Sequence, residues 1–204
     1  APAATTQAPT EVPPTQVEPT PTLAQYTHAA FGFSFAYPSS WFGPDEYISG
    51  GTLRLEVGSD VVYPYGTGLD ERVYTLPNSY YVLIQYTQND QNQVWNDTFQ
   101  ALGNLQDGES ISDARSLTIR VSALEMGRFT GYEYIATLSE SAQTEPFYAR
   151  QVILMDPQTN DLLTVMGSPN NVDLSGVDWR QAYQAIDEAN QTIFEQIVES
   201  INIE

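Results

Sequence analysis

The 204-residue chain contains no cysteine, no lysine and only one histidine. The absence of cysteine excludes disulfides, thiolate nucleophiles and thiolate metal sites. The absence of lysine excludes Schiff-base chemistry on this chain and phosphate binding by a P-loop, since both need that side chain. A single histidine argues against a transition-metal site and a Ser-His-Asp triad, so we expect His28 to be a structural or surface residue. These absences favour a protein that is not an enzyme.

The chain also lacks long hydrophobic runs and a balance of charges. Its apolar runs are far shorter than the ~20 residues of a transmembrane helix. Acidic residues number 26 against seven arginines, which gives a formal net charge of −19. Such a charge argues against nucleic acid and anionic membrane surfaces, because both are bound through clustered basic residues. Charged residues make up only 16% of the chain, so the surface is depleted in bases, which favours an extracytoplasmic protein over a salt-adapted cytosolic one.

Residues 1–22 differ in composition from everything that follows. They hold six of the thirteen prolines, six threonines and no hydrophobic residue larger than valine. Such a segment cannot bury enough apolar surface to fold. The aromatic sequence FGFSFAYPSSWF follows at 31–42. We therefore predict a disordered Pro/Thr-rich stalk or linker over 1–22 and a single folded domain over 23–204.

Alternation of apolar and small or polar residues predicts a series of strands. The pattern is clearest at 31–37, where every second residue is Phe or Tyr. Further strands are expected at 52–57, 80–87, 117–121, 129–139, 147–155 and 162–166. The polar sequence DPQTND between the last two is typical of a hairpin turn.

Two segments carry the three-and-four spacing of an amphipathic helix. In the first, Asp90 and Gln93 form a capping-box pattern, with Gly103 as the expected end. In the second, Asp178 precedes about twenty residues whose apolar stripe includes Ile193 and Ile197, and such a stripe needs a sheet to pack against. The element order predicts an α+β domain with an antiparallel sheet packed by helices.

This element order resembles the PsbP-like fold, a family that includes an extrinsic photosystem protein and many bacterial lipoproteins. The residues that carry the resemblance are GFSFAYPSSW at 32–41, the hairpin ending in LLTV at 162–165, and the closing Phe194-x-x-Ile197-x-x-Ser200. The resemblance covers roughly residues 26–203. It implies an α/β/α sandwich and carries no activity, because its motifs are core and turn residues.

Within that family, the stalked bacterial lipoproteins are the nearer likeness. The photosystem subunit docks through lysines, and this chain has none. The likeness implies an extracytoplasmic protein held on the outer face of the bacterial cell membrane by a lipid anchor upstream of Ala1.

Carboxylates are the remaining groups that could perform chemistry. Two sets could hold a calcium ion through hard oxygens: Asp156, Asn160 and Asp161 in the hairpin turn, and Asn89, Asp90 and Asp97 near the first helix. Turn and capping roles explain both sets as well. No other cofactor is expected.

The loop at 60–81 is larger than a connection between two strands requires. At about twenty residues it exceeds the usual connection length, and its prolines and glycines prevent regular structure. Its five tyrosines would suit a protein or glycan surface. We predict partner-binding roles for Tyr63, Tyr65 and Tyr74. The alternative is a loop folded back on the sheet, with its rings in a satellite cluster.

These observations lead to three hypotheses for function. The first is a non-enzymatic extracytoplasmic accessory or binding protein, a subunit of a membrane-bound assembly, whose partner is a protein with a neutral or basic surface in the membrane or cell envelope. The second is a carbohydrate-binding module that uses the tyrosine loop, and the third is a small carboxylate-dependent hydrolase. A subunit should show a contiguous apolar patch, a glycan module a planar row of exposed aromatics, and an enzyme a concave pocket with shifted carboxylates.

Overall fold

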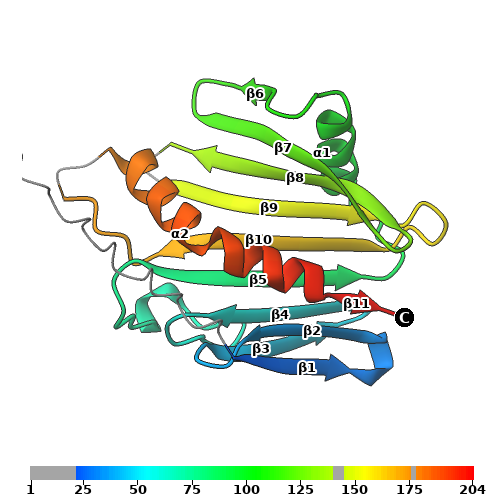
Figure 1. Cartoon of the computed structure of the whole chain (residues 1–204), viewed down its shortest axis with the longest axis horizontal. Helices are drawn as coiled ribbons and strands as arrows, with labels where there is room; N and C mark the ends of the chain where they lie inside the picture. The colour runs from blue at the N-terminus through cyan, green and yellow to red at the C-terminus, as the bar shows by residue number, and fades with distance from the viewer. Residues whose placement is uncertain (1–21, 140–144, 176–177) are drawn as a thin grey trace, which may run out of the picture.

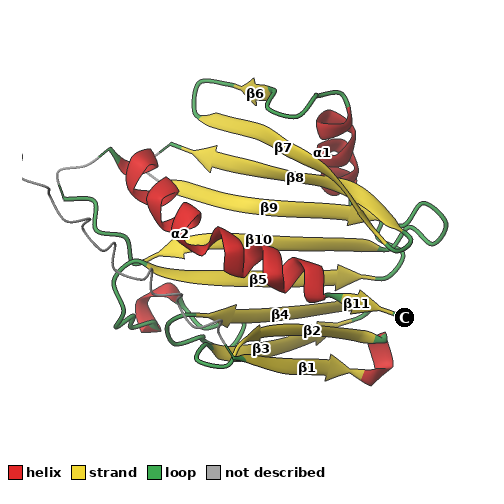
Figure 2. Cartoon of the chain, in the orientation of Figure 1, coloured by secondary structure: helices red, strands yellow, loops and turns green. Residues whose placement is uncertain are grey.

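The computed structural model describes residues 22–139, 145–175 and 178–204. The predicted stalk therefore lies, except for its last residue, outside the described residues. The described part is mostly β: an eight-stranded antiparallel sheet, a three-stranded sheet and two α-helices (Figures 1 and 2). No helix in these ranges is both long enough and apolar enough to cross a membrane.

The large sheet contains all the predicted strands except the first. Its spatial order is β3 (Phe42–Ser49), β4 (Thr52–Gly58), β5 (Ser79–Thr87), β10 (Leu162–Asn170), β9 (Phe147–Met155), β8 (Phe129–Leu138), β7 (Ser116–Met126) and β6 (Ser110–Ser112). Every neighbouring pair is antiparallel. The turn at 156–161 joins β9 to β10, which confirms the predicted hairpin.

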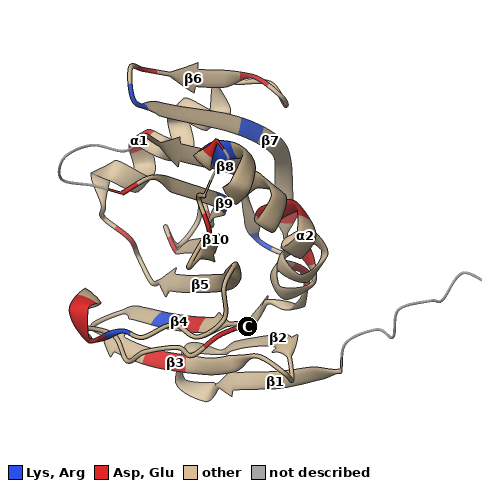
Figure 3. Ribbon diagram, turned by 90° about the vertical axis from the view of Figure 1, so that its left-hand side faces the viewer, with Lys and Arg blue, Asp and Glu red and all other residues tan. Residues whose placement is uncertain are grey.

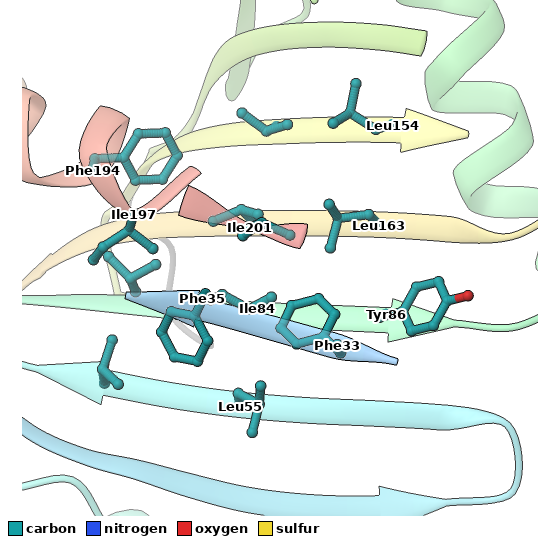
Figure 4. Close-up of a cluster of buried hydrophobic side chains, with 14 of the residues drawn as sticks. Phe33, Phe35, Leu55, Ile84, Tyr86, Leu154, Leu163, Phe194, Ile197 and Ile201 are labelled. Atoms are coloured by element: carbon teal, nitrogen blue, oxygen red, sulfur yellow. The ribbon is translucent and has the colours of Figure 1, made fainter. Parts of the chain in front are cut away.

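One face of the large sheet, called the front here, is covered by the small sheet and by α2 (Trp179–Ser200). The small sheet has the order β1 (Leu23–His28), β2 (Phe33–Pro38) and β11 (Asn202–Ile203). Its Phe33 and Phe35 are each 1% exposed and pack with Phe194 and Ile197 of α2 against the sheet (Figure 4). The α2 prediction is confirmed, including its cap, because Asp178 accepts hydrogen bonds from the N–H groups of residues 180 and 181.

The opposite, back face carries α1 (Gln93–Gly103) over one end. Leu102 of α1 is 1% exposed and packs with Tyr134, Ile153 and Leu162, which alternate with the front-face core residues along their strands. The predicted cap is wrong by two residues: Asn92 caps the helix, whereas Asp90 accepts a hydrogen bond from the N–H of Asn92 in the turn before it.

Three further differences concern the amino-terminal part. The strand β1 was not predicted. The first predicted strand begins at Phe33, because Ala29–Phe31 form a 3₁₀ turn, η1, that His28 caps by accepting from the Phe31 N–H. This confirms a structural role for His28. The edge strand β3 was not predicted, because Gly43 and Pro44 interrupt its alternation and its pairing with β4 shifts between Phe42 and Asp45.

Candidate functional site

The long loop between β4 and β5, residues 59–78, lies against the back face beside β3 and β4. Figure 3 shows it on the side of the sheet opposite α2. Asp60, 2% exposed, anchors it by accepting hydrogen bonds from the N–H groups of Thr75 at 2.7 Å and Leu76 at 2.8 Å. Burial alone would raise the pKa of the Asp60 carboxyl, but these bonds and one from Val61 outweigh it and hold the pKa below its ordinary value.

Two of the three predicted partner-binding tyrosines pack within the loop. The Tyr63 hydroxyl donates to the Val73 carbonyl at 2.7 Å and accepts from the Val73 N–H at 2.8 Å. The Tyr74 ring meets Tyr63 and Tyr81 edge-on, each with centroids 5.9 Å apart. Tyr63 and Tyr74 are half-buried, so this part of the loop matches the satellite-cluster alternative.

Tyr65, the third predicted residue, faces solvent and is 54% exposed. Its ring centroid lies 4.3 Å from that of Tyr47 on β3, and the Arg54 guanidinium lies 4.7 Å from the Tyr65 centroid. Its backbone N–H donates to the Asp45 carboxylate at 3.0 Å. These contacts join the loop to the edge strand.

Exposed apolar side chains are concentrated on this edge strand and loop. Seven of the eleven exposed large apolar residues in the described part of the chain lie between residues 42 and 76, and we call them the β3–loop surface: Phe42, Tyr47, Ile48, Tyr65, Leu69, Val73 and Leu76. Leu69 and Val73 are the most exposed of these, at 80% and 68%. Tyr47 pairs with Arg54 and faces the back with the loop, whereas Ile48 pairs with Leu53 of the front-face core. Exposed apolar residues are frequent in this region, and large exposed apolar patches are typical of interaction sites.

A groove lies between this loop and the back faces of three strands. We call it the back groove: a cavity of about 240 Å³ lined by Arg54 and Glu56 of β4, Arg72 and Tyr74 of the loop, Tyr81 and Leu83 of β5, and Met166, Ser168, Pro169 and Asn170 of β10. Arg54 is 16% exposed and donates from Nη2 to Glu56 at 2.6 Å. Arg72 donates from Nη2 to the Thr67 carbonyl at 3.1 Å.

Several hydrogen-bond donors in the back groove lack an acceptor. Arg54 Nη1, Arg72 Nε and Asn170 Nδ2 are buried, and no acceptor for them is found among residues 22–139, 145–175 and 178–204. The Asp45 carboxylate lies 3.9 Å from Arg54 Nη1, too far for a hydrogen bond. Sequence reasoning missed all three residues, because they are far apart in the chain and no local spacing links them.

The residues proposed for calcium are used by the protein itself. Asp156 and Asp161 both lie next to Arg128, at 2.8 and 3.5 Å. A hydrogen bond from the Gln158 N–H holds the pKa of Asp156 below its ordinary value, whereas burial and a hydrogen bond to Asp161 raise the pKa of Tyr86 to about 12. Within the described ranges, no three acidic or histidine side chains are grouped to hold a metal ion. The described residues therefore give the calcium hypothesis no support.

A further carboxylate, Asp187 of α2, is fully buried between the helix and the sheet. It accepts hydrogen bonds from Arg150 Nη2 at 2.8 Å and from the hydroxyls of Tyr80 and Tyr148 at 3.0 and 3.4 Å. Arg150 also donates to Glu133 at 2.6 Å. This network attaches α2 to the sheet, and its Glu133 also lines a small cavity beside Phe194 and Val198 of α2.

The chain matches no protein-family model and no curated protein sequence. Among solved structures it is similar to a Bacteroides thetaiotaomicron protein, with 14% identity and a TM-score of 0.33. The alignment covers 88% of this chain and 48% of that one, so the chain spans about half of that protein's length. A likeness this distant carries no argument about fold family or function.

Proposed function

We propose that this chain is a non-enzymatic extracytoplasmic binding domain, a subunit or accessory of an assembly in the cell envelope. Its partner docks on the β3–loop surface. The observation that carries the proposal is the concentration of seven of the eleven exposed large apolar side chains in one edge strand and one loop. Isolated exposed apolar residues are normal on any protein, whereas a group of this kind indicates a partner.

The way the loop is built supports the same proposal. Asp60, Tyr63 and Tyr74 fix its backbone from the inside, while Leu69 and Val73 point their side chains to solvent. A preorganised loop loses little conformational entropy on binding, which favours affinity. The partner contacts would therefore come from Tyr65 and its apolar neighbours rather than from Tyr63.

The geometry favours a binding role over the two alternatives. The tyrosine rings do not form the planar row of a glycan-binding module: Tyr47 and Tyr65 are inclined by 38°, and Tyr63 and Tyr74 by 88°. The back groove contains a single carboxylate, Glu56, and that carboxylate is paired with Arg54. Glycoside hydrolysis needs two carboxylates on either side of the bond.

The finer assignment to the stalked, PsbP-like lipoproteins is part of the proposal. It rests on the turn formed by Tyr37, Pro38 and Trp41, on the closing helix and on the Pro/Thr-rich residues 1–22. Two helices on opposite faces of an antiparallel sheet support it. In that assignment the acidic, lysine-free domain stands away from the anionic membrane on its stalk and meets a neutral or basic partner surface.

A matched pair of valine substitutions tests the docking surface. Val73 in the loop and Val94 on α1 are each 68% exposed, so Val73→Ser and Val94→Ser change the same area of apolar surface. We expect the purified Val73→Ser protein to retain much less partner than the parent in a quantitative pull-down from native cell envelope. Val94→Ser should retain as much as the parent.

Tyr65→Ser extends the test to the predicted aromatic contact. We expect this variant to fold with an unchanged thermal midpoint and to lose partner in the same pull-down. Retention of every partner by both Val73→Ser and Tyr65→Ser would show that the loop is only a connector. Equal loss from Val73→Ser and Val94→Ser would point to non-specific apolar adhesion.

A further inference from the structure

We propose that the back groove binds a small ligand through a carboxylate group. The groove lies on the inner side of the loop, between Arg72 and the strands β4, β5 and β10. It uses none of the residues of the β3–loop surface, so the proposal does not depend on the docking partner. Its volume of about 240 Å³ corresponds to about eight water molecules at ~30 Å³ each, which is room for a ligand the size of one amino acid.

The unpaired donors are the first argument. Of the five buried side-chain polar atoms without a hydrogen-bond partner in the described part of the chain, three line this one groove: Arg54 Nη1, Arg72 Nε and Asn170 Nδ2. Buried donors are nearly always satisfied in native proteins, so each needs an acceptor. All three are donors, and one ligand that accepts hydrogen bonds would satisfy them together.

The charge of the lining is the second argument. Arg54 is paired with Glu56, whereas no ion pair to Arg72 is found among the described residues. The charged groups that line the groove therefore sum to one positive charge, in a chain whose net charge is −19, and the Asp45 carboxylate lies outside the lining, 3.9 Å from Arg54 Nη1. A single excess positive charge matches a carboxylate better than a doubly charged phosphate. Guanidinium groups also suit the planar, two-oxygen geometry of a carboxylate.

The remaining wall indicates what the carboxylate is attached to. Tyr74, Tyr81, Leu83, Met166 and Pro169 give the groove apolar and aromatic lining beside the donors. Small-molecule sites commonly combine an apolar wall with a few polar groups that fix orientation. We therefore infer a compact apolar or aromatic carboxylate rather than a sugar with hydroxyls on every side.

Benzoate is the probe for this proposal, and benzamide, which has a similar shape and no charge, is the control ligand. We expect benzoate to shift the NMR signals of the Asn170 side-chain amide and of the residues around the groove in a saturable manner, and benzamide to bind at least tenfold more weakly. This comparison uses the unmodified protein, so it does not depend on the folding of a variant. Equal binding of the two ligands, or no saturable shift with benzoate, would overturn the proposal.

A matched pair of arginine substitutions locates the charge. Arg72→Gln should weaken benzoate binding by about tenfold to a hundredfold, as expected when a hydrogen bond to a charged group is lost. Arg180 also has a buried Nε without a partner in the described residues, but it lies on α2 over the Trp179 ring, outside the groove. Arg180→Gln should bind benzoate like the parent. An undiminished affinity in Arg72→Gln would contradict the assignment.

The source of the carboxylate can be separated with a second probe. N-acetylphenylalanine carries the same group as the end of a peptide. Saturable binding of both ligands, with N-acetylphenylalanine bound more tightly than benzoate, would support the carboxylate site and identify a peptide terminus as its occupant. The docking proposal is tested separately: it fails if Val73→Ser keeps its partner, whatever the result with benzoate. The two proposals can therefore be told apart.

Discussion

Removing the Asp187 carboxylate should destabilise the domain more than any surface substitution. Asp187 is fully buried on α2, and its partner Arg150 has a side chain that is 6% exposed. In Asp187→Ala the guanidinium keeps only Glu133, and the hydroxyls of Tyr80 and Tyr148 lose their acceptor. Breaking a buried charge pair from one side costs about 3–5 kcal/mol, because the other charge stays buried and uncompensated. For a domain of this size, we expect a fall of ~10 °C in thermal midpoint.

Chemical denaturation with matched variants separates charge from shape. Asp187→Asn keeps the size of the side chain and loses its charge. Its free energy of unfolding should therefore lie between that of the parent and that of Asp187→Ala. Glu188→Ala, at the exposed neighbouring position, should change the unfolding free energy by no more than about 0.5 kcal/mol. In an Arg150→Met background, Asp187→Ala should cost less by about 0.5–3 kcal/mol, since the two groups interact directly. A cost below about 1 kcal/mol for Asp187→Ala would refute the view that this network attaches α2 to the sheet.

Three further predictions concern the core, acid stability and the stalk. Ile197 is 1% exposed, so Ile197→Ala should lower the free energy of unfolding in denaturant by about 2–5 kcal/mol. Ile193 is half-buried, so Ile193→Ala should lower it less. An Ile197→Ala protein as stable as the parent would contradict the packing of α2. Because folding lowers the pKa of the Asp60 carboxyl, its contribution to stability is present above its ordinary pKa of about 3.9 and is lost as pH falls below that value. The free energy of unfolding, measured against pH, should therefore fall less steeply in acid for Asp60→Asn than for the parent. An unchanged profile would contradict the role of Asp60. Removing residues 1–21 should leave the thermal midpoint unchanged, and a drop of several degrees would mean that they pack on the domain.

The strongest periodic patterns in the sequence predicted the elements that bury the most apolar surface. The stripe through Ile193 and Ile197 and the cap at Asp178 predicted α2, because helix and cap depend on residues within a few positions of one another. The same locality explains the 156–161 hairpin. The strand β3 was missed because Gly43, Pro44 and a shift in pairing break its alternation. Six of its eight residues, 42–43 and 46–49, are exposed, so burial leaves little periodic signal.

The candidate site could be predicted only in part. The length of the loop and its tyrosines marked it from sequence, but which rings face inward depends on Val73, Tyr81 and Asp60, whose contacts only the folded chain defines. The donors of the back groove come from β4, the loop and β10. Their proximity follows from the pairing of β5 with both β4 and β10, which no local pattern specifies.

Site-specific photocrosslinking in the native envelope tests the docking proposal most directly. A photoreactive residue is placed at position 73 in one protein and at position 94 in another, the two equally exposed valine positions. The proposal predicts a discrete crosslinked product from position 73 that disappears when Tyr65→Ser is added, and none from position 94. The same products from both positions, or none from position 73, would contradict it.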